Sequence, residues 1–279
     1  MKNLYKPSSL ISYLSSLDIK LKKSLSQNFL IDKNIIDKMI SSADIQSDDI
    51  VLEIGAGAGI LTFEIAKKAK KVIAIEKDDI FAKELKNYRV DNIETLNIDF
   101  LKLDLNDLKK IDKKIKVISS IPYSLTTPII TKLLNNFSLF SSITLMVQKE
   151  VAQKIIAKSS TKLYGFFSVF VQFYSDAKII QIASKNCFLP KPKVDSAIIE
   201  LKIKNDFFKT LDPNFSFEKF LLFVKQGFSQ RRKKLVSLIK TYISKEKLLY
   251  ILDKLNINRN ARAENLSLND FLALYKKLF

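Results

Sequence analysis

The chain has 279 residues, 47% of them hydrophobic and 27% charged, and it carries a formal net charge of +18. One cysteine and no histidine exclude an intrachain disulfide, a multi-cysteine or histidine-ligated metal site, and any catalytic group built on imidazole. No apolar stretch approaches the roughly 20 residues that cross a bilayer, and the N-terminus lacks an apolar run followed by a cleavage site, which predicts a cytoplasmic protein without a membrane partner.

The segment from about residue 50 to residue 147 alternates short apolar runs with longer amphipathic stretches. Helical patterns lie at residues 61–69 and 80–88, for example. Strands that alternate with helices at this spacing predict an α/β fold, in which a mostly parallel sheet has helices on both faces. The expected buried strands are residues 50–54, 71–75, 93–98, 116–120 and 142–147.

Two later runs, residues 165–174 and 194–203, are rich in β-branched and aromatic residues. We expect them to pair as antiparallel strands at one edge of the sheet. Beyond Asn205 the pattern becomes helical, with helices expected at residues 217–224, 231–242, 245–255 and 267–279, the last of them capped by Ser267 and Asp270. The chain is therefore predicted to contain a sheet domain over residues 1–204, with residues 1–20 as an N-terminal extension, and a small all-helical domain over residues 205–279.

Three of the five glycines, Gly55, Gly57 and Gly59, lie within five residues between a strand and the following helix. A tight turn here lets a ligand lie against the main chain. The spacing is G-x-G-x-G, whereas sites for dinucleotide pyrophosphates favour G-x-G-x-x-G. Glu53, just before the turn, suits a cofactor with cationic sulfonium and ammonium groups better than one with a pyrophosphate.

Acidic residues also end the next two strands. Glu76 follows Gly55 by 21 residues, where a carboxylate can accept both hydroxyls of a ribose, and Asp99 is placed to accept from an adenine amine. Either residue alone could be a solvated carboxylate at a strand end. Together with Gly55 and Gly57 they predict a site for S-adenosylmethionine.

The fourth strand leads into the segment SSIPYSLTTP at residues 119–128. Enzymes that methylate exocyclic amines of nucleobases have this order of a polar residue, a proline and an aromatic residue. Such an amine needs alignment and acceptors for its protons rather than a strong base. Ser120 and a neighbouring carbonyl, held by the rigid Pro122, can supply the acceptors, and Tyr123 can stack on a base swung out of its helix. A proline turn with a buried tyrosine is the purely structural alternative.

Four of the five arginines lie in the last 49 residues, and two of them belong to the basic run formed by Arg231, Arg232, Lys233 and Lys234. Arginine makes multi-donor phosphate contacts better than lysine does. The lysine excess elsewhere can also reflect an AT-rich coding bias. The arginines therefore carry the prediction that the C-terminal part, and this run in particular, binds RNA.

The residues singled out above belong to an ordered series of motifs. These are SQNFL at 26–30, VLEIGAGAGILT at 51–62, IPYSLTTPI at 121–129, MVQKEVA at 146–152, YGFFSV at 164–169, FLPKPKVDSAII at 188–199, FSQRRKKL at 228–235 and RAENLS at 262–267. From about residue 21 to residue 271 the chain resembles the small-subunit ribosomal RNA adenine dimethyltransferases. The resemblance implies a Rossmann-like class I methyltransferase domain, with a doubly wound sheet, followed by the small helical domain.

The resemblance also implies roles for single residues. Asn28 and Leu30 are expected to line the cofactor pocket together with Gly55, and Phe188 is expected to cover the face of the target base opposite Tyr123. The implied substrate is a pair of adjacent adenosines in the 3′-terminal hairpin loop of small-subunit rRNA, dimethylated within the 30S particle, with a role in ribosome biogenesis. We expect the protein to act as a monomer.

The chain departs from the family pattern at two positions. Ser26 stands where glycine is usual before Gln-Asn-Phe, and Ser120 stands where asparagine is usual before the Ile-Pro-Tyr segment. Serine still accepts a hydrogen bond, but it reaches less far and lacks the fixed geometry of an amide. We therefore expect Ser120 to serve both the cofactor and the target amine, with a lower efficiency of transfer and the same type of reaction.

Three other functions fit parts of the pattern. A large-subunit rRNA adenine methyltransferase of the macrolide-resistance type shares the fold, but residues 231–235 and 262–267 resemble the small-subunit group. A ribosome-assembly factor that keeps the fold without turnover is favoured by Ser120. A nicotinamide-dependent oxidoreductase is disfavoured by the glycine spacing.

Overall fold

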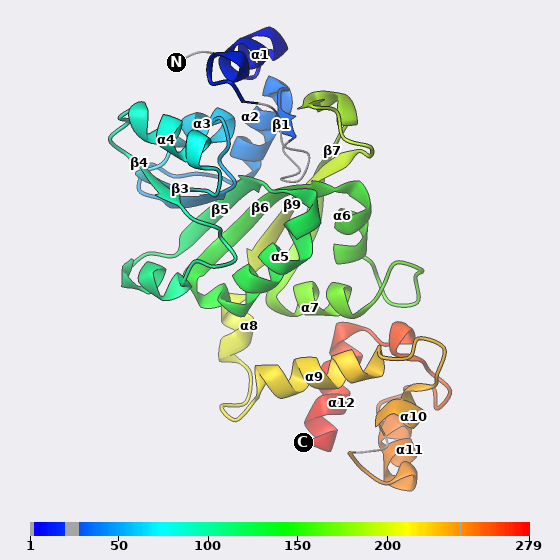
Figure 1. Ribbon diagram of the computed structural model, residues 1–279. Coiled ribbons are helices and arrows are strands. Elements are labelled where there is room, and N and C mark those ends of the chain that lie inside the picture. Colours follow the sequence, from blue (N-terminus) through cyan, green and yellow to red (C-terminus); the bar gives the residue numbers. More distant parts are fainter. Residues whose placement is uncertain (1–2, 20–27, 240–241) are drawn as a thin grey trace. The chain divides into compact units, whose positions relative to one another are not determined.

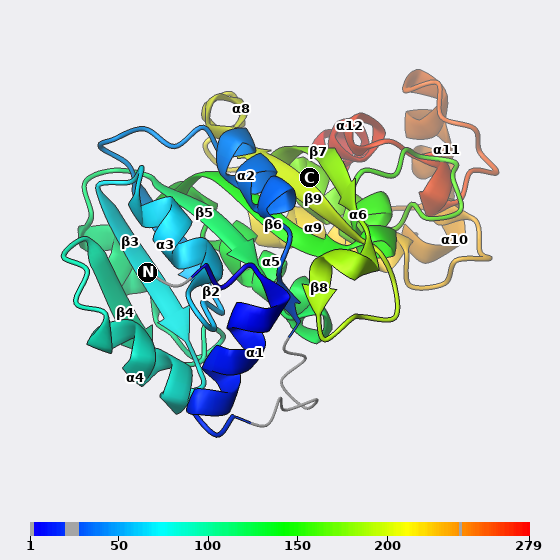
Figure 2. The same cartoon turned by 90° about the horizontal axis from the view of Figure 1, so that it is seen from above.

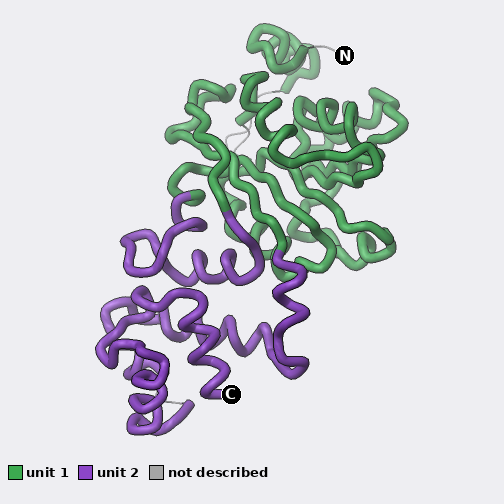
Figure 3. Tube along the Cα trace, turned by 180° about the vertical axis from the view of Figure 1, so that it is seen from behind, with its two compact units in different colours: residues 1–152, 178–203 green, residues 153–177, 204–279 purple. Residues whose placement is uncertain are grey.

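The computed structural model describes residues 3–19, 28–239 and 242–279 (Figure 1). Its internal contacts divide the chain into two compact units (Figure 3). The first unit consists of residues 1–152 and 178–203, and the second consists of residues 153–177 and 204–279.

The division differs from the predicted one at a single segment. The chain re-enters the second unit at Lys204, next to the boundary predicted after residue 204. Residues 153–177, placed in the sheet domain by the sequence pattern, belong to the second unit instead. The reason is that α7 (Phe166–Tyr174) packs against α9 (Phe217–Gly227) and α12 (Leu268–Leu278) of the C-terminal segment.

A seven-stranded sheet, built mainly from the first unit, has the strand order β4-β3-β2-β5-β6-β9-β7. The strands β2 to β6 pair in parallel, and β9 runs antiparallel to β6, from Ser142↔Lys202 to Gln148↔Ser196. This topology confirms the predicted α/β fold. The strands are β2 (Ile50–Ile54), β3 (Lys71–Glu76), β4 (Ile93–Asn97), β5 (Ile115–Ser120), β6 (Phe140–Gln148), β7 (Ser175–Ala183) and β9 (Ser196–Ile203).

Helices cover both faces of the sheet (Figures 1 and 2). On one face, Met39 and Leu61 from two helices pack into a buried cluster with Val51, Ile118 and Ile198 from three strands. The apolar stripe of each helix is thereby removed from water, which is the main stabilising contribution to such a layer. The helices around the sheet are α2 (Lys33–Ser42), α3 (Ile60–Ala66), α4 (Asp79–Asn87) and α5 (Thr126–Asn135), and α6 (Lys149–Ile155) follows β6 directly.

A separate two-stranded ladder joins two distant motifs. β1 (Phe29–Leu30) pairs antiparallel with β8 (Phe188–Leu189), with Phe29 opposite Leu189 and Leu30 opposite Phe188. The ladder therefore brings the SQNFL and FLPKPKVDSAII motifs together.

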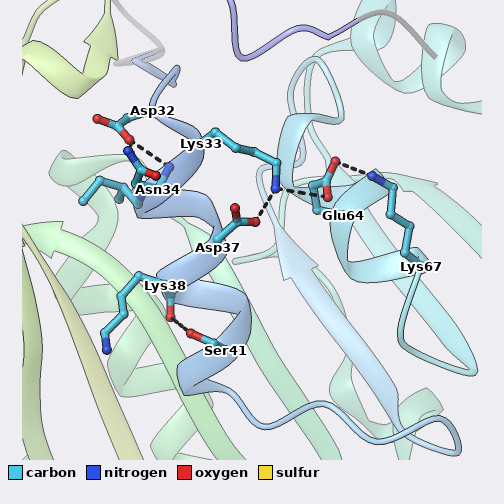
Figure 4. A network of polar contacts seen from close by, with 9 residues as sticks. Asp32, Lys33, Asn34, Asp37, Lys38, Ser41, Glu64 and Lys67 are labelled. Carbon is cyan, nitrogen blue, oxygen red and sulfur yellow. Dashed lines mark hydrogen bonds and ion pairs between the residues drawn. The ribbon is translucent and has the colours of Figure 1, made fainter.

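Polar contacts fix the start of α2 immediately after this ladder (Figure 4). The carboxylate of Asp32 caps the helix by accepting a hydrogen bond from the backbone N–H of Asn34 at 2.9 Å. The ammonium of Lys33 contacts Asp37 on its own helix and lies 3.6 Å from a carboxylate oxygen of Glu64 on α3. α2 and α3 are thus linked at their exposed sides as well as through the core.

The N-terminal extension contains a helix, α1 (Pro7–Ser16). Pro7 suits its first turn, where the backbone N–H has no helical partner. The side chains of Leu10 and Tyr13 are buried in a cluster that includes Phe29 of β1 and Phe81 of α4. Residues 1, 2 and 20 of the predicted extension lie outside the described residues.

The second unit is helical, as the sequence predicts for its C-terminal part, and its core is aromatic. The ring of Phe173 lies between 4.9 and 6.1 Å, centroid to centroid, from five other phenylalanine rings. Those rings belong to Phe207, Phe208, Phe215, Phe217 and Phe220. The helices that complete the unit are α8 (Asn205–Lys209), α9, α10 (Leu235–Ile239), α11 (Lys245–Lys254) and α12.

Two secondary-structure predictions are wrong in this unit. Residues 165–174 form the helix α7 instead of a strand, because a short and mostly apolar run carries no periodicity that separates helix from strand. The backbone N–H of Gly165 donates to the hydroxyl of Ser168 at 3.2 Å and so satisfies a group at the helix start. The helix predicted from residue 231 begins at Leu235, and residues 240–241 lie outside the described residues. Within the described ranges, no helix has both the length and the apolar character that a bilayer span requires.

Candidate active site

A cavity of about 290 Å³ lies at the carboxyl ends of the parallel strands of the first unit. Parallel strands bring their carboxyl ends to one edge, which is where α/β proteins bind ligands. Every residue predicted for the cofactor lines this cavity, and so do three of the four predicted acceptor residues. They are Asn28, Leu30, Gly55, Gly57, Glu76 and Asp99 for the cofactor, Ser120 for both, and Pro122 and Tyr123 for the acceptor. Ser26 lies outside the described residues.

The glycine bend adopts a backbone conformation that other residues rarely take. Gly55, Gly57 and Gly59 have φ values of +76°, +53° and +79°. A Cβ atom on Gly57 would lie 3.1 Å from the ring of Phe29, and one on Gly59 would lie 2.6 Å from the ring of Phe63. Both the left-handed backbone and the close packing therefore require glycine here. The bend leaves its main chain exposed to the cavity.

Glu76 holds this bend in place. One carboxylate oxygen of Glu76 accepts a hydrogen bond from the backbone N–H of Gly57 at 2.7 Å, and the other accepts from the N–H of Asp78 at 2.7 Å. Burial raises the pKa of the Glu76 carboxyl, while these backbone donors oppose the shift. The carboxylate is thus fixed at the end of β3, with the remaining lone pairs of its oxygens available to a ligand.

Asp99 lies at the end of β4, as predicted. One of its oxygens accepts from the N–H of Leu101 at 2.9 Å, and the other accepts from the ammonium of Lys77 at 2.9 Å. The hydrogen bond to Lys77 is the main reason that the pKa of the Asp99 carboxyl is lowered. An ionised carboxylate can only accept hydrogen bonds, which suits a donor such as an adenine amine.

Glu53 is the least satisfied polar group of the cavity wall. Its side chain is buried, and its Oε2 atom has no hydrogen-bond partner within the part of the chain that the structure describes. Burial raises the pKa of the Glu53 carboxyl to about 8. A buried carboxylate without a partner is costly unless a cation approaches it. The residues of this cavity therefore fit a nucleoside that carries positive charge.

The acceptor segment follows β5. The hydroxyl of Tyr123 lies 2.5 Å from the hydroxyl of Ser196, and burial raises the pKa of the phenol. The rings of Tyr123 and Phe188 meet edge to face, with centroids 6.5 Å apart and planes at 74°. Phe188 is buried and does not line the cavity. The structure thus brings the rings of Tyr123 and Phe188 into contact, and of the two only Tyr123 lines the cavity.

One residue near the cavity was missed in the sequence. The ammonium of Lys132 on α5 donates to the carbonyl oxygens of Phe100, Leu101 and Leu103 at 2.8, 2.9 and 2.5 Å. It thereby holds the loop that follows Asp99, two of whose residues line the cavity. A lysine on an amphipathic helix gives no sign of such a role in the sequence, because the three carbonyls lie about 30 positions away.

The basic run of the second unit lies in a turn before α10. The guanidinium of Arg231 donates to the carboxylate of Glu264 and to the carbonyl of Lys162, both at 2.8 Å. Lys234 donates to the side-chain oxygen of Asn260 at 2.7 Å. All four residues of the run are exposed. Arg231 and Lys234 therefore combine an exposed position with a hydrogen bond to another part of the second unit.

A glycine bend after the first parallel strand, carboxylates at the next two strand ends and a Ser-Ile-Pro-Tyr segment at the fourth define a methyltransferase of the α/β class. The comparisons with known proteins are more specific. Residues 19–278 match the model of the family described as ribosomal RNA adenine dimethylase. The chain belongs to this family, which confirms the assignment made from its motifs.

Similar proteins cover almost the whole chain. The ribosomal RNA small subunit methyltransferase A of Protochlamydia amoebophila is 40% identical over 99% of this chain and 98% of its own, and that of Mycoplasmopsis synoviae is 42% identical over 95% and 100%. Among solved structures, a dimethyladenosine transferase from Plasmodium falciparum has a TM-score of 0.74 and 29% identity over 89% of this chain and 98% of its own. The 23S rRNA methyltransferase ErmE has a TM-score of 0.70 and 26% identity over 90% and 99%.

Proposed function

We propose that this protein uses S-adenosylmethionine to dimethylate the exocyclic amines of two adjacent adenosines in the 3′-terminal hairpin loop of small-subunit rRNA, within the 30S particle. The observation that carries the proposal is the cavity in which Glu53, Glu76 and Asp99 lie together with Tyr123. These three carboxyl groups differ in burial and in hydrogen bonding, so each of them suits a different part of one ligand. The aromatic ring beside them suits a base.

Each carboxylate has its own task in this proposal. Glu76 holds the ribose hydroxyls, Asp99 accepts from the adenine amine, and the buried carboxylate of Glu53 compensates the positive charge of the cofactor. Asn28 and Leu30 close the pocket from the β1 side. When bound, the cofactor supplies a methyl group on a sulfonium, whose leaving group is a neutral thioether.

The acceptor residues align the target amine. Its lone pair is delocalised into the purine ring, so the protein supplies position and proton acceptors instead of a strong base. Ser120 and a neighbouring carbonyl, held by Pro122, draw on the amine protons as the nitrogen becomes tetrahedral. Tyr123 stacks on the extruded adenine. Phe188, predicted from the family to cover the opposite face of the base, contacts the ring of Tyr123 in the structure and supports it.

The second unit binds rRNA phosphates in this proposal, through Arg232 and Lys233 above all, and the protein acts as a cytoplasmic monomer that also contributes to ribosome biogenesis. Arg232→Ala is expected to weaken particle binding and to lower the slope of log affinity against log salt by about 1. Arg231→Ala is expected to lower the stability of the second unit as well, because it breaks the contacts with Glu264 and Lys162. Cofactor affinity should change in neither variant.

Incorporation of labelled methyl groups tests the function. Unmethylated 30S particles, naked 16S rRNA and naked 23S rRNA are offered in parallel, and mass spectrometry locates the product. Dimethyladenosine in 30S particles alone supports the proposal. Transfer to 23S rRNA would favour the large-subunit activity, which the likeness to ErmE keeps as the second candidate. Tight particle binding with no incorporation would favour an assembly factor without turnover.

A further inference from the structure

The segment Val194-Asp195-Ser196 belongs to the FLPKPKVDSAII motif, which begins at Phe188. Ser196 is the first residue of β9 and is completely buried. Its hydroxyl lies 2.5 Å from the phenol oxygen of Tyr123, 73 positions earlier in the chain. Because the phenol oxygen of Tyr123 has no other hydrogen bond among the described residues, this contact sets the direction of its ring.

Asp195, the residue before Ser196, acts on the position of the Phe188 ring. A carboxylate oxygen of Asp195 accepts a hydrogen bond from the backbone N–H of Lys185 at 3.0 Å. Lys185 opens the short 3-10 turn Lys185–Cys187, which leads directly into Phe188. The backbone carbonyl of Asp195 also accepts from the N–H of Lys149 at 3.0 Å, so Asp195 itself is tied to the end of β6.

We infer that Asp195 and Ser196 are positioning residues for the target base: Ser196 orients Tyr123, and Asp195 fixes the turn that carries Phe188. Two consecutive residues at the start of one strand thereby set the spacing and the angle between the two rings. Ser196 is locked opposite Gln148 in the sheet register, so the reference point for both rings is the rigid sheet. This inference rests on the proposed function, because it assigns the two rings to the base.

The expected effect lies in transfer and not in cofactor binding. Ser196→Ala removes the hydrogen bond to Tyr123, and a hydrogen bond of this kind corresponds to about a 2- to 10-fold change. We expect kcat to fall, or KM for the particle to rise, by that factor, while cofactor affinity stays within twofold. Tyr123→Phe removes the same hydrogen bond from the other side and should have a similar effect.

A double-mutant cycle isolates the pair. The combination of Ser196→Ala with Tyr123→Phe should cost no more than the larger single change, since both remove one bond. Effects that multiply would overturn the inference for Ser196. Thr144→Val is the matched control, because the hydroxyl of Thr144 is equally buried on the neighbouring strand β6 and has no hydrogen bond among the described residues. It should leave transfer unchanged.

Asp195 is tested by conservative rescue. Asp195→Ala removes the acceptor for the Lys185 N–H, whereas Asp195→Asn keeps an oxygen that can accept it. Transfer should fall in the first variant and recover in the second. Fluorescence of RNA with 2-aminopurine at the target position reports stacking directly, and its quenching by the protein should weaken in Ser196→Ala and Asp195→Ala.

The outcomes separate the two proposals. An inactive wild-type protein in the same assay would count against the proposed function. An active wild-type protein with unchanged kcat, KM and quenching in both alanine variants would overturn only the inference about Asp195 and Ser196. If Ser196→Ala does not fold, as thermal denaturation would reveal, Tyr123→Phe and Asp195→Ala still decide the matter.

Discussion

The two ends of the cavity are built in different ways. At the cofactor end, the Gly55 to Gly59 bend is held by the carboxylate of Glu76 through a backbone N–H, and Asp99 is held by another. At the acceptor end, Tyr123 is held by the hydroxyl of Ser196 and by the edge of Phe188. Backbone N–H groups hold both carboxylates at the first end, where Lys77 also binds Asp99, whereas only side-chain contacts orient the ring of Tyr123 at the second.

This difference has a consequence for how each end responds to change. A backbone in the left-handed region cannot accept another side chain without strain, so substitutions at the bend should reduce stability and cofactor affinity together. A side-chain contact can be removed while the backbone stays in place. Substitutions at the acceptor end should therefore reduce methyl transfer and leave the cofactor bound.

The largest effect is expected for Gly59→Ala. At φ +79°, the added Cβ would lie 2.6 Å from the ring of Phe63 and 2.7 Å from Leu85. Strain and overpacking together should lower the free energy of unfolding of the first unit by about 2–4 kcal/mol. Denaturation in urea measures this loss, and calorimetry should show cofactor affinity falling with it.

Other glycines serve as graded controls for this change. Gly55→Ala carries the same kind of backbone strain at φ +76°, but its nearest neighbour would be 3.7 Å away, so a smaller loss is expected. Gly165 has an extended backbone, and nothing lies within 4 Å of its added Cβ. Its replacement by alanine should cost no more than about 1 kcal/mol, as at other helix caps. Equal losses in all three variants would refute the argument from local geometry.

The next largest effect is expected for Tyr123→Ala. Stacking of a base on an aromatic side chain is worth about 1–3 kcal/mol, which corresponds to a loss of about 5- to 150-fold in kcat/KM. Cofactor affinity should change much less, although Tyr123 lines the same cavity. Labelled-methyl transfer and a cofactor titration measure the two quantities separately. Equal losses of kcat/KM and of cofactor affinity would contradict the distinction between the two ends of the cavity.

The difference between the two ends of the cavity also explains which of its residues could be predicted from the sequence. The cofactor end could be predicted because each element follows from local pattern: Gly55 to Gly59 between a strand and a helix, and Glu76 and Asp99 at strand ends. Parallel pairing then requires those ends to meet at one edge of the sheet. Gly55, Gly57, Glu76 and Asp99 all line the cavity. Their roles toward a bound cofactor remain predictions.

The rest of the architecture depends on contacts between distant residues, which no local pattern encodes. Ser196 meets Tyr123, and Lys132 meets the carbonyls after Asp99, across 73 and about 30 positions. The helix α7 was missed for a related reason, since its β-favouring residues are overridden by burial in the aromatic core of the second unit. In these cases the sequence motifs predicted which segments matter, but they did not predict which distant residues contact one another.

A smaller effect on stability and cofactor affinity is expected from the protonation of Glu53 as the pH changes. Its pKa in the folded protein, about 8, lies above the ordinary value of 4.5 because of burial. The folded state therefore binds the proton more tightly than the unfolded chain, and the free energy of unfolding should fall as the pH rises from about 4.5 through 8. A cationic ligand favours the ionised carboxylate, so cofactor affinity should rise about 3- to 10-fold between about pH 6.5 and 8.5.

Glu53→Gln should remove both trends. It leaves Glu76 and the ionisable groups of the cofactor in place, so any pH dependence that survives belongs to them. Thermal denaturation and cofactor titration over the same pH range measure the two trends. Affinity that falls with rising pH in the wild-type protein, but not in Glu53→Gln, would contradict the placement of positive charge beside Glu53.

The smallest effect is expected at Ser120, where the two ends of the cavity meet. Ser120→Asn introduces the amide that the family pattern has at this position, and one better-placed acceptor should raise kcat by about 2- to 5-fold. Ser120→Ala removes the acceptor and should lower kcat by a similar factor. Single-turnover transfer measures both, with cofactor affinity determined alongside. If the two variants change cofactor affinity instead of kcat, Ser120 belongs to the cofactor end alone, and the amine protons must be accepted by backbone carbonyls beside Pro122.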